Sequence, residues 1–278
     1  MEEKPRFPKP LEAFLVIIAG FIFIVLLTQF FLWIFISQPE ELEETSTIFK
    51  ILITLGEFGL IIIPLIYIKN LNLSLKETFR WNGIPREIVF WSVIIGISMS
   101  LIGDEMDRLV SIIIPAPEFL AEISAAMQIN STLDFFILVM GAVIAAAFVE
   151  ESIIRGFLQK SLEKYQDVTR AVIYASLAWT IIHGMLYWAI QIFLLGIILG
   201  LLAWRSNSIF PSVIGHAINN TLALVFNNIH QENLEGIYLW GDHVSPLFLI
   251  LASMGLFFGV KYFNQYYGNS PTNPYTMN

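Results

Sequence analysis

The sequence predicts an all-α membrane protein whose chain crosses the bilayer several times. Of its 278 residues 56% are hydrophobic and only 14% are charged, and the mean hydropathy is +0.70. A soluble domain carries about 25% charged residues. Several apolar runs are long enough to cross the hydrocarbon core, which takes about 20 residues as a helix. We therefore expect the lipid bilayer to be the main partner of this chain.

Net charge and cysteine content exclude several kinds of site. The formal net charge is −8 and the sequence has no basic stripe, which argues against nucleic acid as a partner. The chain has no cysteine. Disulfides, thiolate metal sites, cysteine nucleophiles and cysteine lipidation are therefore excluded in this sequence.

The apolar runs predict eight spans. The first run is too long for the hydrophobic part of a signal peptide and lacks a small-x-small cleavage site, so we expect it to be a retained span. We expect one transmembrane domain at 11–265, a cytoplasmic tail at 1–10 and a disordered tail at 266–278. The expected spans are 11–36, 48–68, 87–103 or a longer form to 114, a fourth that starts after the cap-like stretch 131–134 and runs past 155 into 158–160, then 169–184, 188–204, 209–227 and 246–263.

Local signals place the helix boundaries around the middle of the chain. Pro115-Ala116-Pro117 ends the third span, because proline lacks the amide donor that a helix needs. Residues 118–129 predict a short amphipathic helix at the membrane interface. Ser131 begins the fourth span as a cap, and a turn near 165–168 separates the fourth span from the fifth.

Basic residues predict the orientation. With these spans, thirteen of the 15 Lys and Arg residues fall on one side of the membrane, and only Lys50 and Arg108 fall on the other. Cytoplasmic loops carry the excess of Lys and Arg. Both termini are therefore expected in the cytoplasm.

The most unusual stretch of the fourth span is Phe148-Val149-Glu150-Glu151-Ser152-Ile153-Ile154-Arg155-Gly156. A charged side chain near the middle of a span costs about 2.5–3.5 kcal/mol, and such residues usually take part in function. Glu151 and Arg155 are four residues apart, acid before base, which favours a pair on one helix face. Glu150 points about 100° away. It is therefore the carboxylate left for a general base.

Two other spans bring polar residues to the same depth. His183 and Glu150 each lie about 24 Å from the turn that joins their spans, since a helix rises about 1.5 Å per residue. Trp179 precedes His183 by one turn. His216 and Asn220 share a face of the seventh span at a comparable depth. A single histidine in a span is usually a packing residue, but the matched depth of the whole set favours a functional site.

The remaining polar residues give weaker signals. Glu57 lies inside the second span without a partner in its own helix, so both packing and function stay open for it. His230 and His243 fall in an outer loop with acidic residues, and we expect them to be solvated.

The three motifs resemble those of the CPBP family of intramembrane endopeptidases. This family includes the CAAX prenyl proteases and the bacteriocin-processing or self-immunity (Abi) proteases. The resemblance covers roughly 133–230, the expected catalytic core. Trp179 stands where the family usually has Phe, a difference expected to change cavity shape but not chemistry. The matching residues are Glu150, Glu151 and Arg155, then Trp179 and His183, then His216 and Asn220.

The resemblance implies an intramembrane peptidase with a cavity open to the cytoplasm and formed by the fourth, fifth and seventh helices. Its substrate would be a CAAX-type prenylated tail or a small membrane-associated peptide. In one mechanism Glu150 and His183 activate a water, while His216 and Asn220 stabilise the oxyanion, with Glu151, Arg155 and Trp179 in support. In the other, Glu150, His183 and His216 bind a divalent metal such as zinc. The sequence has no His-Glu-x-x-His signature, and we favour the glutamate–water mechanism.

Two other functions fit the same residues. Glu and His inside a membrane also serve proton relays, so an ion-coupled transporter is an alternative. Paired, broken helices in corresponding halves, which many transporters have, are not evident in the sequence. A non-catalytic immunity or scaffold protein is the other alternative. Compact loops and the His-x-x-x-Asn segment look prokaryotic, which predicts the cell membrane as the location.

Overall fold

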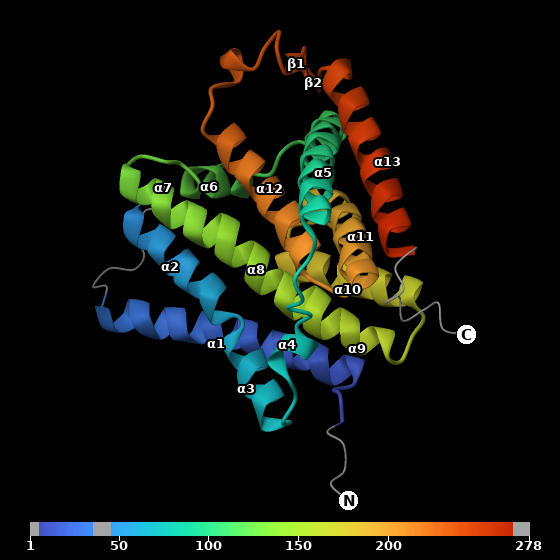
Figure 1. The fold of residues 1–278 in the computed structure, drawn as a ribbon. Coiled ribbons are helices and arrows are strands. Elements are labelled where there is room, and N and C mark those ends of the chain that lie inside the picture. The colour runs from blue at the N-terminus through green and yellow to red at the C-terminus, as the bar shows by residue number, and fades with distance from the viewer. Residues whose placement is uncertain (1–5, 36–45, 269–278) are drawn as a thin grey trace, which may run out of the picture.

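The computed structural model describes residues 6–35 and 46–268. Residues 1–5 of the predicted N-terminal tail, residues 36–45 and residues 269–278 of the predicted C-terminal tail lie outside this part of the chain. Residues 266–268, which were predicted to belong to the disordered tail, are instead the end of the last helix. The fold is mostly helical, as predicted (Figure 1). The first half contains α1 (Pro10–Phe35), α2 (Thr47–Gly59), α3 (Ile62–Asn70), α4 (Leu75–Thr78), α5 (Arg86–Ile113), α6 (Phe119–Ala126) and α7 (Thr132–Leu138).

In the second half, η2 follows α7 without a break, and a short β-hairpin precedes the last helix. Its elements are η2 (Val139–Ala145), α8 (Ala146–Glu151), η3 (Ser152–Leu158), α9 (Gln159–Glu163), α10 (Val168–His183), η4 (Leu186–Trp188), α11 (Ala189–Ser206), α12 (Phe210–Asn227), η5 (Gln231–Asn233), β1 (Leu239–Trp240), β2 (His243–Val244) and α13 (Pro246–Gly268). The two strands pair antiparallel, with Leu239 opposite Val244.

Helix length and apolar composition confirm a multi-pass membrane protein. In the described part of the chain, 6 helical stretches are long and apolar enough to cross a membrane: Pro10–Ile34, Thr47–Asn70, Arg86–Ile113, Thr132–Glu163, Leu186–Ser206 and Pro246–Gly268. The third stretch takes the longer of its two expected forms. α10 and α12 form where the fifth and seventh spans were expected, but they are not among these stretches. The count of eight spans therefore remains a prediction.

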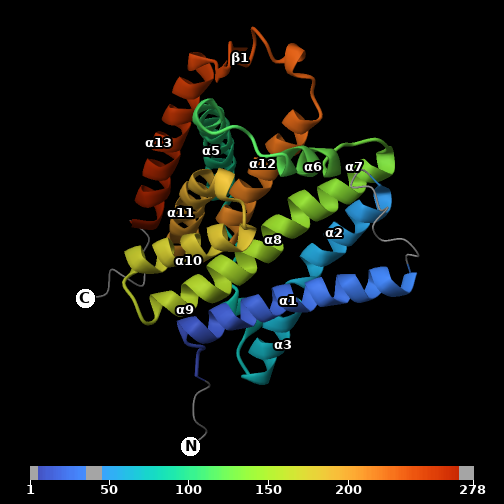
Figure 2. The ribbon, with the colours of Figure 1, turned by 180° about the vertical axis from the view of Figure 1, so that it is seen from behind.

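One long helix organises the fold, and we call α7, η2, α8, η3 and α9 together the central helix. In both views α1 and α2 lie on one side of it, and α5, α11 and α13 lie on the other (Figures 1 and 2). α10 packs against α9 and α11, and α12 packs against α5 and α8. The two helices that carry the other predicted site residues, α10 and α12, therefore both pack against the central helix.

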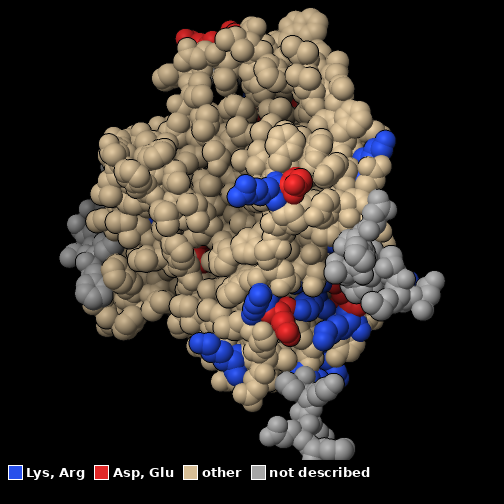
Figure 3. All heavy atoms as spheres, viewed as in Figure 1, with Lys and Arg blue, Asp and Glu red and all other residues tan. Residues whose placement is uncertain are grey.

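The surface suits a lipid environment. Large apolar side chains such as Trp33, Ile113 and Leu247 are exposed. On the face in Figure 3, most Lys and Arg side chains gather at the end where α3, α4 and α9 lie, and much of the remaining surface is uncharged. The basic side chains on this face are therefore concentrated at one end of the structure.

The central helix begins as its sequence predicted. Ser131 is the N-cap, and its hydroxyl accepts a hydrogen bond of 3.0 Å from the backbone N–H of Asp134. The Asp134 carboxylate accepts from Lys50 Nζ at 2.8 Å, and both side chains are buried. This ion pair joins the N-terminal end of α2 to the start of the central helix.

Two π-helical segments, η2 and η3, flank α8, which carries both glutamates. π-helical turns are rare and occur frequently at functional sites, because the wider turn redirects side chains. The side-chain amide of Asn220 on α12 donates to the carbonyl of Ala142 in η2 at 2.8 Å. A residue of the predicted site therefore holds one of these unusual turns.

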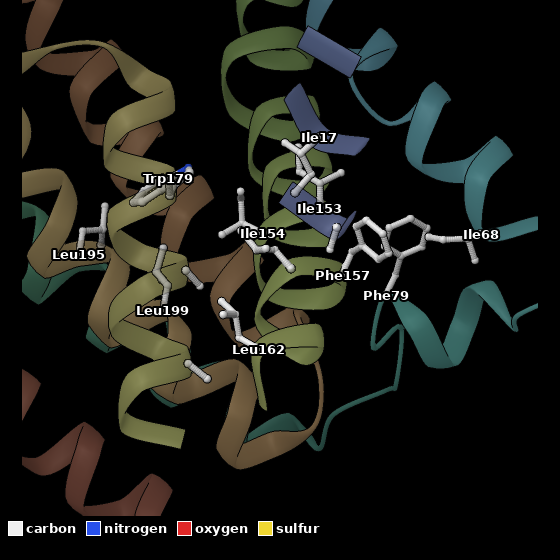
Figure 4. Close-up of a cluster of buried hydrophobic side chains, with 14 residues drawn as sticks. Ile17, Ile68, Phe79, Ile153, Ile154, Phe157, Leu162, Trp179, Leu195 and Leu199 are labelled. Carbon is white, nitrogen blue, oxygen red and sulfur yellow. The ribbon is translucent and has the colours of Figure 1, made fainter. Parts of the chain in front are cut away.

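The main apolar core lies around η3 (Figure 4). Gly156 allows the chain after α4 to pass close to the central helix, since an added Cβ would lie 2.7 Å from the backbone of Phe79. The labelled core residues come from α1, α3, the central helix, α10, α11 and the chain after α4: Ile17, Ile68, Phe79, Ile153, Ile154, Phe157, Leu162, Trp179, Leu195 and Leu199.

The hairpin end of the molecule has its own polar contacts with α5. The Tyr238 hydroxyl donates to Asp104 Oδ2 at 2.7 Å, and burial together with this carboxylate raises the pKa of Tyr238. His243 was expected to be solvated; its side chain is about half exposed, and Nδ1 lies 2.8 Å from Glu105 Oε1. These contacts fasten the hairpin to α5.

Candidate active site

Glu151 and Arg155 form the ion pair that their spacing predicted. Arg155 Nη1 lies 2.9 Å from Glu151 Oε1, and both side chains are fully buried. Because a buried charge is costly unless it is paired, each residue of this pair depends on the other. The pair contributes a fixed carboxylate and a fixed cation inside the bundle.

His216 joins this pair. Its Nδ1 lies 3.1 Å from the same Glu151 oxygen, and the ring is buried. The Arg155 guanidinium lies over the Trp179 ring, with its carbon 4.3 Å from the ring centroid. We call Glu151, Arg155 and His216 the buried cluster. Trp179 contacts both this cluster and Glu150.

Glu150 lies at the indole N–H of Trp179 and near His183, outside the buried cluster. The indole Nε1 of Trp179 donates to Glu150 Oε2 at 2.6 Å. His183 Nε2 lies 3.8 Å from that same oxygen, which is too long for a direct hydrogen bond. A single water can contact both atoms across this distance. The structure therefore brings Glu150 and His183 together, as their equal distance from the turn predicted.

The orientation of the His183 ring follows from its backbone partner. Nδ1 lies 2.8 Å from the carbonyl oxygen of Trp179, one turn earlier in α10. A carbonyl only accepts, so Nδ1 carries the hydrogen, and Nε2 of the neutral ring is an acceptor facing Glu150.

Glu150 and His183 line a cavity of about 150 Å³. Its walls come from α1, the α2 region, the central helix and α10. They are mainly apolar, with Glu57 as a further carboxyl group. α12 contributes no residue to this lining, so a contribution of the seventh helix to the expected cavity is not confirmed. The lining residues are Phe21, Glu57, Leu60, Glu150, Ile153, Ile154, Trp179, Ile182 and His183.

A family model covers the part of the chain that holds these residues. The model described as "Type II CAAX prenyl endopeptidase Rce1-like" matches residues 132–222, about a third of the chain. The match confirms the family that the three motifs indicated. Residues 132–222 are similar to the CAAX prenyl endopeptidases, and we call them the CAAX protease segment. Searches of curated proteins and of solved structures found no match.

The CAAX protease segment contains all seven residues predicted from sequence. It begins one residue after the Ser131 cap and ends in α12, two residues beyond Asn220. At the level of the family, this supports an intramembrane peptidase whose setting is the lipid bilayer. Glu57 lies outside the segment, although it lines the same cavity.

The zinc alternative requires three ligands to converge. Glu150 and His183 do so, but His216 lies in the buried cluster against Glu151. Within residues 6–35 and 46–268, three or more His, Cys, Asp or Glu side chains are nowhere grouped as a metal site. This arrangement of the CAAX protease residues does not fit a three-residue zinc site.

Two features of this CAAX protease cavity were not predicted. The first is the hydrogen bond from Trp179 to Glu150; an indole N–H is the one polar group that Trp has and Phe lacks, so Trp179 affects more than cavity shape. The second is the presence of Glu57 beside Glu150. The intramembrane carboxyl of Glu57 was visible in the sequence, but its approach to Glu150 depends on how α2 packs.

A second cavity, of about 230 Å³, lies among α5, α11, α12 and α13. Its lining is almost entirely apolar, with Gln191 and Asn219 as polar exceptions, and neither Glu150 nor His183 reaches it. Peptide hydrolysis needs a base and a water, so we place the candidate site of the CAAX protease segment in the smaller cavity.

Proposed function

We propose that this chain is an intramembrane endopeptidase in which Glu150 and His183 activate a water for peptide hydrolysis. The observation that carries the proposal is the pairing of Glu150 Oε2 and His183 Nε2, 3.8 Å apart on the wall of one cavity. A carboxylate and a neutral imidazole that face one water can hold it and take its proton. The family match supports the same reaction class.

In the proposed reaction the water donates hydrogen bonds to Glu150 and His183. Glu150 takes a proton as the water oxygen attacks the scissile carbonyl carbon, which gives a tetrahedral oxyanion. Collapse of this intermediate breaks the C–N bond, and Glu150 returns the proton to the leaving amine. The Trp179 N–H fixes the orientation of the Glu150 carboxylate throughout.

Oxyanion stabilisation by His216 and Asn220 is part of the proposal. His216 uses Nδ1 toward Glu151, and Asn220 uses one amide hydrogen toward Ala142. Asn220 keeps a second amide hydrogen, which suits a developing negative charge. His216 can donate from Nε2 as well when its ring is protonated, because both ring nitrogens then carry a hydrogen.

The proposed substrate is a CAAX-type prenylated tail or a small membrane-associated peptide. A cavity inside an apolar bundle suits a substrate that is already at the membrane. The gathering of Lys and Arg at one end supports cytoplasmic termini. We propose that the cavity opens to the same side of the membrane. A prokaryotic cell membrane remains the proposed location.

Purified protein in detergent tests this function. A prenylated tail peptide and an unprenylated peptide of the same sequence are incubated with it, with and without a metal chelator, and products are identified by mass spectrometry. We expect cleavage of at least the prenylated peptide, at the same rate in both conditions. Loss of cleavage with chelator and its return with zinc would favour the metal mechanism. Ion flux in proteoliposomes without any product would favour a transporter.

A further inference from the structure

Glu57 is one of three polar residues on one face of α2. Lys50, Thr54 and Glu57 are spaced by four and three residues, which places them in line along the helix. This face packs against the central helix. Close approach is possible at Gly141, where an added Cβ would collide with Thr54 Oγ1.

The first two of these residues are bonded to the central helix or to the chain before it. Lys50 Nζ contacts Asp134 Oδ2 at 2.8 Å and the Gln128 carbonyl at 2.6 Å. Thr54 Oγ1 donates to the Ile137 carbonyl at 3.3 Å. Both side chains therefore have a structural role at the interface of α2 with the central helix.

Glu57 differs from them. Its Oε2 is buried and has no hydrogen-bond partner within the described part of the chain. Its carboxyl group lines the cavity and interacts electrostatically with Glu150. A buried polar atom without a partner costs about 1–3 kcal/mol, and an apolar residue would pack there without that cost. Packing alone therefore does not account for a glutamate at this position.

We propose that Glu57 is a positioning residue that holds water in the cavity beside Glu150 and His183. The inference rests on the proposed peptidase function, and it assigns a role in that function to a residue outside the matched segment 132–222.

The composition of the cavity supports this role. Five of its nine lining residues, namely Phe21, Leu60, Ile153, Ile154 and Ile182, are aliphatic or phenyl side chains. Apolar cavities stay dry, and an ordered water needs about two to four polar partners. Glu150 and His183 supply two such partners. Glu57 supplies a third from the opposite helix, so that the attacking water and its neighbours are retained between α2 and the central helix.

Two substitutions of Glu57 separate water positioning from packing. Glu57→Leu removes the polar group and keeps the bulk, and we expect kcat for peptide cleavage to fall about 10- to 100-fold while KM changes little. Glu57→Gln keeps hydrogen-bonding capacity, and we expect it to recover most of the lost kcat. Leu55→Ala, at an exposed position of the same helix, is the matched control. Thermal unfolding of each variant in detergent accompanies the kinetics.

The outcomes distinguish the inference from the function on which it rests. A low kcat in Glu57→Leu with normal KM and normal thermal stability, together with recovery in Glu57→Gln, supports the positioning role. Wild-type kcat in Glu57→Leu overturns it and leaves the peptidase proposal intact. A fall in kcat that accompanies unfolding, or that Gln does not restore, assigns Glu57 to structure and also overturns it. A wild-type chain that cleaves no peptide overturns both.

Discussion

Replacement of His183 by alanine is expected to lower kcat for peptide cleavage by about 10²- to 10⁴-fold, the usual contribution of a positioned acid or base. The imidazole ring of His183 is oriented so that one of its nitrogens can bind the attacking water. Nδ1 is engaged by the Trp179 carbonyl, so Nε2 is the acceptor that faces Glu150 across 3.8 Å. Without the ring, the water would lose its second acceptor beside Glu150. Initial rates on the prenylated peptide measure this effect.

His243→Ala is the matched control for that variant. His243 is also close to a carboxylate, Glu105, but it lies in the hairpin away from the cavity. We expect it to retain wild-type activity. If His183→Ala cleaved as fast as His243→Ala, His183 would have no part in the reaction.

Replacement of Arg155 by alanine is expected to destabilise the protein by about 3–5 kcal/mol, because Glu151 would keep a buried charge without its partner. The loss of the contact with the Trp179 ring adds to this effect. The measurement is thermal unfolding in detergent, with the yield of monodisperse protein as a second readout.

An exposed ion pair provides the comparison. Arg170 lies 3.2 Å from Asp167, and both side chains are more than half exposed. Arg170→Ala should change stability by about 0–1 kcal/mol. The double variant Glu151→Gln/Arg155→Met should recover part of the stability lost in Arg155→Ala, since it removes both charges. Equal stability of Arg155→Ala and Arg170→Ala would show that burial of the pair does not matter.

Sequence reasoning located the helices and the main contacts of the site because those depend on local spacing. Apolar runs gave the spans, and the cap at Ser131 marked a helix start that the structure confirms. The four-residue spacing of Glu151 and Arg155 predicted their ion pair, which the structure confirms. The equal distance of Glu150 and His183 from one turn predicted that the two side chains lie close together, as they do.

The rest depends on how separate helices pack, which spacing along one helix does not encode. His216 turns to Glu151 instead of joining Glu150, and Glu57 reaches the cavity through the contact between Thr54 and Gly141. The π-helical segments around α8 have no clear sequence signal, because they arise from small shifts in hydrogen bonding along a continuous helix.

The most direct test of the central claim compares wild-type protein with Glu150→Gln on one prenylated tail peptide. The substituted amide would keep the shape of the side chain and an oxygen for the Trp179 N–H, but it could not take a proton from water. We predict cleavage at a single bond by the wild type and no product from the variant, with equal thermal stability of the two proteins. Cleavage by Glu150→Gln at the wild-type rate would contradict the account.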